Sequence, residues 1–223
     1  LKKHYPTQDL ATGPDIIFFW VARMIMAGLY FKKQIPFSNV YFNGLIRDEE
    51  GKKFSKSLGN SPDAIDLMDK YGADALRVGL LLIAPQGLDI LFKEEKIEHG
   101  RNFMNKLWNA SRFVQMNVDE KLISKIDISK IELDIPERWI LNKLNQTAID
   151  INRQFDRFHF NEAAKLIYEF TWSDFCDWYI EIAKTRFYSD DDSKMVTYNI
   201  CIESIRKILP LLHPYTPFIT EEL

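Results

Sequence analysis

Residues 40–60 read VYFNGLIRDEEGKKFSKSLGN, and the fold can be worked outward from this stretch. Its apolar start, from Val40 to Leu45, is typical of a β-strand. The run from Arg47 to Gly51 then has the composition of a tight polar turn. The stretch therefore predicts a strand and a tight turn, followed by a lysine-rich segment that the turn positions.

That segment, residues 52–60, is called the basic loop below. Lys53 and Lys56 alternate with Ser55 and Ser57, and Gly59 allows the backbone to fold tightly. Ammonium groups, hydroxyls and inward-facing backbone N–H groups together suit a polyphosphate. The alternative is a solvated basic surface loop, which is the common state of short lysine runs.

Upstream, a strand is expected from Thr7 to Ala11 and a helix from Pro14 to Tyr30. Proline suits the first helical turn, and Asp15 suits the positive end of the helix dipole. The helix has almost no polar face, which predicts that it is buried between a sheet and other helices. Strand, helix and strand in succession indicate a parallel pair with a crossover.

Downstream, the sequence predicts helices almost without interruption. Ser61 is expected to cap the first of them, which ends at Tyr71 and Gly72. A second runs from Ala73 to about Ile83. The later helices are expected at residues 93–117, 135–156, 160–188 and 195–212, with a short one from Pro217.

Composition limits the class of protein. The chain has 223 residues, of which 46% are hydrophobic, enough for one or two packed domains. No run of eighteen uninterrupted apolar residues is present, so no membrane span is expected. Cys176 and Cys201 lie in apolar helical surroundings, which favours buried thiols and a reducing cytoplasm. The four histidines are scattered, and no metal site is predicted.

Charge is divided unevenly along the chain. Residues 1–60 carry nine Lys/Arg and five Asp/Glu, a net charge of +4. Because the whole chain has a net charge of −3, residues 61–223 carry a net charge of −7. A polyanionic partner would therefore meet local basic positions on the later helices, such as Arg153 and Arg157, which share a helix face. Leu1 in place of an initiator Met and a helix still running at Leu223 favour a piece of a longer protein.

The basic loop carries a resemblance to a known family. Lys53-Phe54-Ser55-Lys56-Ser57 resembles the Lys-Met-Ser-Lys-Ser signature of class I aminoacyl-tRNA synthetases, with Phe54 in place of Met. The flanking residues 44–48 and 58–60 are also similar to what surrounds that signature. A match over about twenty residues is far more specific than one over five.

Other segments resemble the valyl-tRNA synthetases within this class. They are residues 13–24 (GPDIIFFWVARM), 71–77 (YGADALR), 107–113 (LWNASRF) and 160–180 (FNEAAKLIYEFTWSDFCDWYI). The isoleucyl enzymes are the nearest alternative, but they would show Asp-Gln-x-Arg-Gly-Trp where this chain has Asp15 to Trp20. The family's His-x-Gly-His signature and its editing insertion do not occur here, and Asn43 stands where a His is frequent.

The resemblance implies roles for the loop residues. Lys56 and Lys53 are the implied catalytic residues, which stabilise charge on the phosphates of ATP during adenylate formation. Ser55 and Ser57 are implied as further donors to the nucleotide. Mg²⁺ would be held mainly by the nucleotide, because no acidic cluster resembles a dedicated site.

The upstream segment has implied roles of its own. Gly13 and Asp15 would approach the ribose, the glycine through its backbone and the carboxylate by accepting from two hydroxyls. Trp20 would wall the amino-acid pocket. The alternatives are that Asp15 only caps the helix and that Trp20 is an ordinary core residue. Base stacking is one possible role for Trp108, Trp139, Trp172, Trp178, Phe170 and Phe175. However, Trp172, Phe175 and Tyr179 recur at helical intervals among apolar residues, which favours a core.

The predicted fold class is mostly α. Residues 1–46 would end a Rossmann-like α/β nucleotide-binding domain, residues 47–98 would form the loop and a helical connector, and residues 99–223 an anticodon-binding-like helical bundle. The parent protein would join valine to ATP and then to its tRNA in the cytoplasm, and this chain alone would be inactive. A non-catalytic tRNA-binding or scaffold protein is the alternative from a different class.

Overall fold

The computed structural model describes residues 3–84, 87–117, 132–189 and 193–223. The chain divides into two compact units, each described by itself. The loop unit comprises Leu1–Ser61 and Ile83–Lys93, and the bundle unit comprises Pro62–Leu82 and Glu94–Leu223. The domain boundaries expected at residues 46 and 98 stay predictions.

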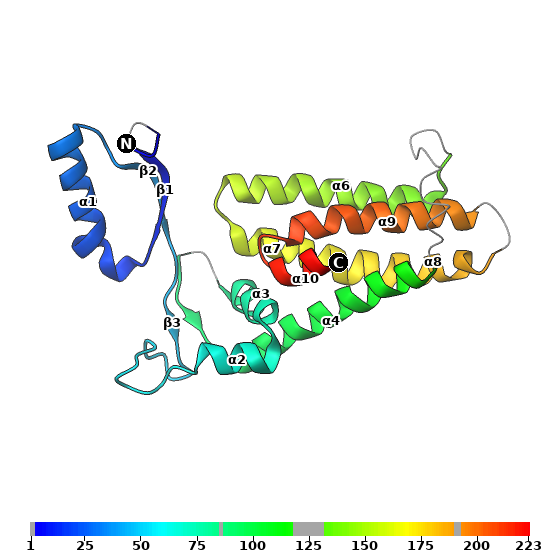
Figure 1. Ribbon diagram of the computed structural model, residues 1–223, viewed down its shortest axis with the longest axis horizontal. Helices are drawn as coiled ribbons and strands as arrows, with labels where there is room; N and C mark the ends of the chain where they lie inside the picture. Colours follow the sequence, from blue (N-terminus) through cyan, green and yellow to red (C-terminus); the bar gives the residue numbers. More distant parts are fainter. Residues whose placement is uncertain (1–2, 85–86, 118–131, 190–192) are drawn as a thin grey trace. The chain divides into compact units, whose positions relative to one another are not determined.

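The loop unit begins with the predicted strand, helix and strand. Strand β1 (Thr7–Thr12) pairs in parallel with β2 (Phe37–Phe42), with Thr7 opposite Phe37. The helical connection between them runs alongside both strands (Figure 1). It is one continuous run of four helical pieces: η1 (Pro14–Ile16), η2 (Ile17–Val21), α1 (Ala22–Ala27) and η3 (Gly28–Lys32).

The expectation that this helix is buried is wrong for the described chain. Val21 and Gly28 are buried, but Phe18 is 83% exposed and Phe31 is 75% exposed. The physical reason is area: a two-stranded sheet covers one side of a helix and leaves the rest of an all-round apolar surface open. The apolar pattern still indicates a surface that needs a packing partner, and the described residues do not cover that surface.

The segment Pro14–Lys32 is also long and apolar enough to cross a membrane by length and composition. Its place in the fold argues for a different role. The helix connects two strands that pair in parallel beside it, so both strands would have to enter the lipid with it. Their outer edges would leave backbone groups unpaired there, at a cost of several kcal/mol for each group.

A second small sheet completes the loop unit. Strand β3 (Ile46–Arg47) pairs in parallel with β4 (Ile90–Leu91). A Cβ atom added at Gly44 would lie 1.8 Å from the carbonyl oxygen of Leu88. The chain before β3 can therefore approach the chain before β4 only because residue 44 is a glycine.

In the bundle unit, helix α2 (Ala64–Tyr71) is followed by α3 (Ala73–Ile83) and α4 (Glu94–Asn117). The prediction of Ser61 as the cap of α2 is wrong, because Asp63 occupies that position and accepts from the backbone N–H of Ile65 at 2.7 Å. Pro62 would have allowed a cap at Ser61 as well, so the cap is assigned by the hydrogen bond that the Asp63 carboxylate accepts.

The connector helix α3 is tied to the far end of the chain. The buried Asp74 accepts from the backbone N–H of Ile219 at 2.7 Å, and Arg77 donates to the carbonyl oxygens of Tyr215 and Pro214. These contacts satisfy backbone groups around the start of helix α10 (Pro217–Glu222). The connector and the C-terminal turn therefore form one packed region.

The long helices of the bundle unit lie side by side (Figure 1). Beside α4 they are α6 (Ile135–Asp156), α7 (Phe160–Glu169), η5 (Phe170–Tyr179), α8 (Ile180–Phe187) and α9 (Ser193–Leu212). The expected helix 160–188 is one run whose middle ten residues are a π-helix. The breakers expected at residues 119–120 and 191–192, and most of 124–134, lie outside the described residues.

The bundle core contains most of what the periodicity predicted. Phe170, Phe175 and both cysteine thiols are buried, and burial raises the pKa of Cys176 to about 12. The core prediction is wrong for two tryptophans: Trp108 is 40% exposed and Trp178 is 61% exposed. Both side chains lie on exposed sides of their helices, and the sequence alone does not identify that side.

Candidate functional site

The basic loop is connected to strand β3 by a tight turn. Asp48 organises this turn: its backbone N–H donates to the Lys52 carbonyl at 2.9 Å, and its Oδ1 accepts from the Lys52 N–H at 2.7 Å. Gly51 takes a φ of 79°, a left-handed conformation that suits glycine. The result is a hairpin in which the backbones of Arg47 and Lys53 form an antiparallel β-bridge.

The loop is closed by the side chain of Asn60. Its Oδ1 accepts from the backbone N–H of Ser55 at 2.9 Å. Its Nδ2 donates to Asp48 Oδ2 at 2.7 Å and to the Lys53 carbonyl at 3.3 Å. One amide therefore holds together the turn, the end of the hairpin and the first residue of the loop tip.

The tip itself is a compact polar turn. The Gly59 N–H donates to the carbonyls of Ser55 and Lys56, and Gly59 has a φ of 65°. The hydroxyls of Ser55 and Ser57 are hydrogen-bonded at 2.7 Å. Lys56 is exposed, and its ammonium group has no hydrogen bond or ion pair within the described parts of the chain.

Asp15 and Lys53, which the sequence assigned to ribose and phosphate, lie in contact. The Lys53 ammonium donates to Asp15 Oδ2 at 2.5 Å. This hydrogen bond holds the pKa of the Asp15 carboxyl below its usual range. The helix-capping alternative is not what the carboxylate does here, because Gly13 is the cap residue and has no side chain to offer.

A second ion pair supports the hairpin from the other side. Asp89 accepts from the Arg47 guanidinium through Oδ2 and from the Leu45 N–H through Oδ1 at 3.0 Å. The Arg47 hydrogen bond lowers the pKa of Asp89, so the carboxylate stays ionised at neutral pH. Phe54 packs against Phe92 with ring centroids 5.4 Å apart, which joins the loop to the segment after β4.

Three residues of this arrangement were missed in the sequence: Asp48, Asn60 and Asp89. The first two stand inside the quoted stretch, where they looked like turn and loop residues. A signal for Asn60 was its position at the end of the basic loop, where an amide can bond back to the backbone. Nothing in the sequence connected Asp89 to a stretch forty residues earlier.

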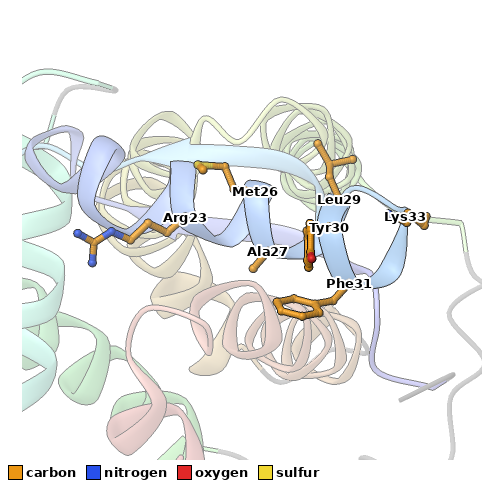
Figure 2. Close-up of a pocket in the computed structure, with 7 residues that line it drawn as sticks. All are labelled: Arg23, Met26, Ala27, Leu29, Tyr30, Phe31 and Lys33. Atoms are coloured by element: carbon orange, nitrogen blue, oxygen red, sulfur yellow. The ribbon is translucent and has the colours of Figure 1, made fainter.

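Trp20 lies on η2 and is 60% exposed, so it is not a core residue of the described chain. The open depression of about 680 Å³ on the same helix lies nearer its end and does not include Trp20 (Figure 2). Arg23, Met26, Ala27, Leu29, Tyr30, Phe31 and Lys33 line it. That surface contains no carboxylate or hydroxyl cluster beyond the Tyr30 phenol, and it does not coincide with the basic loop.

The residues around the loop do not fit a dedicated metal site. Within the described residues, no group of three or more His, Cys, Asp or Glu side chains is placed to hold a metal ion. The nearby carboxylates are already engaged, Asp15 by Lys53 and Asp89 by Arg47. A divalent ion at this place would need its ligands from a substrate.

Comparisons with known proteins identify the family of the chain. Residues 1–93 match the family model of class I tRNA synthetases (I, L, M and V), and residues 137–223 match that of the anticodon-binding domain of tRNA ligases. Over its whole length the chain is 49% identical to the valine–tRNA ligase of Fusobacterium nucleatum and 50% identical to that of Enterococcus faecalis. The chain belongs to the class I aminoacyl-tRNA synthetases. It spans about a quarter of the length of these relatives, 26% and 25%.

Solved structures of the class share the fold. The LeuRS of Agrobacterium radiobacter K84, in a ternary complex with tRNA and LeuAMS, matches with a TM-score of 0.77 at 22% identity, covering 100% of this chain and 28% of that one. The methionyl-tRNA synthetase of Mycobacterium tuberculosis, in complex with methionyl-adenylate, also has a TM-score of 0.77, at 21% identity, covering 99% and 44%. The predicted fold class of this synthetase chain is thus confirmed: mostly helical, with the end of a Rossmann-like domain.

Proposed function

We propose that the chain is the loop-bearing and anticodon-binding part of a valine–tRNA ligase. The whole protein would activate valine with ATP and transfer it to tRNA in the cytoplasm. The relatives that match this chain over its full length, at 47–50% identity, are named for that activity, which supports valine over isoleucine. The activity belongs to the whole protein, and the chain alone is expected to form no adenylate.

The observation that carries the proposal is the contact between Lys53 and Asp15. The family resemblance assigns these residues to two different parts of one substrate, the phosphates and the ribose of ATP. In the structure their charged groups are hydrogen-bonded at 2.5 Å. Two groups that bind adjacent parts of one nucleotide are expected to lie near each other, whereas a loop that is only solvated has no such requirement.

Lys56 is the proposed catalytic residue of the loop. When the valine carboxylate attacks the α-phosphate, negative charge builds on the phosphoryl oxygens and on departing pyrophosphate. A free ammonium on an exposed loop tip can move to that charge, and it stabilises the transition state more than the ground state. The Ser55 and Ser57 hydroxyls, now bonded to each other, would turn to the phosphates as further donors.

Asp15 and Trp20 complete the proposed substrate contacts. Asp15 would accept from the ribose hydroxyls, with Gly13 allowing close approach of the backbone. Trp20 would offer its exposed indole to the valine side chain. Mg²⁺ would be held by the phosphates of ATP, because the nearby carboxylates of Asp15 and Asp89 are paired with cations, and no step here is assigned to it.

The test is valine-dependent exchange between ATP and pyrophosphate, measured with the full-length protein and with this chain alone. The full-length protein should catalyse exchange with valine and not with isoleucine at equal concentration. Absence of exchange in the full-length protein would favour the scaffold alternative. Exchange by this chain alone would show that the site needs none of the sequence that the relatives have in addition.

Replacing Trp20 tests the amino-acid pocket separately. In the full-length protein, Trp20→Ala should raise the KM for valine and leave the KM for ATP nearly unchanged, because the indole meets only the amino acid. The exposed Phe31, on the same helix and equally apolar, provides the matched control. Equal changes in both KM values would assign Trp20 a structural role.

A further inference from the structure

The three hydrogen bonds of the Asn60 side chain, to Ser55, Asp48 and Lys53, are called the clamp, and they have no part in the proposed chemistry. Asn60 nevertheless makes more side-chain hydrogen bonds than any other described residue of the basic loop. Its three hydrogen bonds fit only one orientation of the amide. Oδ1 faces a backbone N–H, that of Ser55, while Nδ2 faces a carboxylate and a carbonyl. The reversed amide would place oxygen against Asp48 Oδ2 and N–H against N–H.

Asp48 completes the clamp. Its Oδ2 accepts from Asn60, and its Oδ1 accepts from the Lys52 N–H at 2.7 Å. Both side chains are half-buried, so water competes less for these bonds than at the loop tip. The hydrogen bond from Asn60 also lowers the pKa of Asp48, which therefore remains a charged acceptor.

Lys53 and Lys56 are held differently by this arrangement. Lys53 is held at both ends, its carbonyl by Asn60 and its ammonium by Asp15. Lys56 follows the clamped Ser55 directly and is free in its side chain, as described above. The loop therefore has a base held by hydrogen bonds, and the exposed ammonium-bearing Lys56 follows directly after that base.

We propose that Asn60, acting with Asp48, is a positioning residue for Lys56: it fixes the base of the loop so that the ammonium reaches the phosphates from a defined point. This inference rests on the proposed function. The rate gain from a charged donor depends on its placement, and a misplacement of about 1 Å costs on the order of 100-fold. Without the clamp, the loop tip would have to be ordered again in every turnover.

The first experiment removes the clamp in the full-length protein. Asn60→Ala should lower the kcat of valine-dependent ATP–pyrophosphate exchange by about 10- to 100-fold. The KM for valine should stay within about twofold, because Asn60 contacts no residue assigned to the amino acid. Asn39→Ala is the matched control, since Asn39 makes the same kind of bond, to Asp9 at 2.8 Å, in the same unit but outside the loop.

The second experiment exchanges the two partners. Asn60→Asp alone places two carboxylates where Nδ2 and Oδ2 now lie 2.7 Å apart, and should be as damaging as the alanine variant. Adding Asp48→Asn restores one amide and one carboxylate in exchanged positions. The double variant should recover at least about fivefold in kcat over Asn60→Asp. This comparison also decides the case if Asn60→Ala lowers the melting temperature.

The third experiment asks whether Asn60 acts through Lys56. In a Lys56→Ala background, Asn60→Ala should cost little more, because the cation that it positions is already gone. Independent full losses in the two variants would overturn the inference, as would Asn60→Ala with wild-type kcat. Absence of exchange in the wild-type protein would instead overturn the proposed function.

Discussion

In the basic loop, one asparagine side chain joins three segments through hydrogen bonds, and the residues it joins are exposed or half-buried. In the bundle, Phe175, Tyr179 and Ile140 have no exposed surface at all. The loop is thus ordered by a few directional polar contacts and the bundle by apolar burial. A loop built this way can be rearranged by a substrate at small cost, whereas the bundle keeps its shape.

The largest effect on stability is expected from the bundle. Phe175→Ala should lower the free energy of unfolding of the bundle unit by about 3–5 kcal/mol, because the ring is fully buried and stacked on Tyr179. Phe218, which is 66% exposed in the same unit, is the control, and Phe218→Ala should stay within about 0.5 kcal/mol. Urea denaturation followed by circular dichroism measures both. Equal effects of the two variants would refute the contrast drawn above.

In the loop, the largest effect should fall on the rate and not on stability. Lys56→Ala in the full-length protein should slow valine activation by about 100-fold, near 3 kcal/mol in the barrier, as expected for one well-placed charged donor. The melting temperature should not change, since the ammonium has no partner in the described chain to lose. Lys52, also exposed and four residues earlier, is the control. A rate within threefold of wild type would mean that Lys56 is only a solvated lysine.

Acid should loosen the loop before it affects the bundle core. The pKa values of Asp15, Asp48 and Asp89 are all lowered from 3.8 by hydrogen bonds to Lys53, Asn60 and Arg47. A carboxyl whose pKa is lowered by folding contributes stability above its unfolded pKa, and that contribution is lost as the pH falls through the folded value. The loop contacts should therefore be constant from pH 7 to about 4 and weaken below 3.8.

The amide of Lys52 provides the measurement, because it donates to Asp48 Oδ1. Its protection factor in hydrogen exchange, corrected for intrinsic rates, should fall as the pH is lowered below about 4. The amide of Phe175, inside the bundle, is the internal control. Loss of protection at Phe175 at a higher pH than at Lys52 would contradict the different origins of order in the two regions.

The same contrast explains what the sequence could predict. Apolar periodicity and proline or glycine breakers located helices such as Glu94–Asn117 and Ile135–Asp156 to within one residue, because burial of a helix face follows from spacing. The π-helical middle of residues 170–179 was missed, since its bonding pattern depends on tertiary packing. Exposure of Phe18 was missed for a related reason: apolarity shows that a surface needs a partner but not where the partner is.

In the site, motif resemblance located the residues proposed for chemistry but not the residues that hold them. Lys53 and Lys56 are recognisable because phosphates need cations at that spacing. Asn60 bonds back to Ser55 and Asp48, and Asp89 reaches Arg47 from forty-two residues away. Such polar contacts have no periodicity, so only the three-dimensional arrangement shows them.

The smallest expected effect concerns tRNA and the acidic bundle. Several of its basic side chains are already paired within the chain: Lys106 with Asp177, Lys143 with Asp174, Lys184 with Glu181 and Arg186 with Glu137. Arg153 pairs with Asp150 at 2.9 Å, whereas Arg157 is exposed and makes no ion pair within the described residues. Arg157 is therefore one cation of the bundle unit that can contact a phosphate without losing a partner among the described residues.

We expect Arg157→Ala to weaken binding of tRNA and to reduce the slope of log affinity against log salt by about 0.7–0.9, the value for one lost phosphate contact. Arg153→Ala should change the slope less, because Asp150 already neutralises that guanidinium. Valine activation without tRNA should be the same in both variants, since neither residue lies in the loop unit. The measurement is tRNA affinity at several salt concentrations, with Arg101→Ala, paired to Glu98 at 2.7 Å, as the matched control. An unchanged slope for Arg157→Ala would exclude this end of α6 from the tRNA interface, because an exposed and unpaired arginine that met the backbone would have to release counterions.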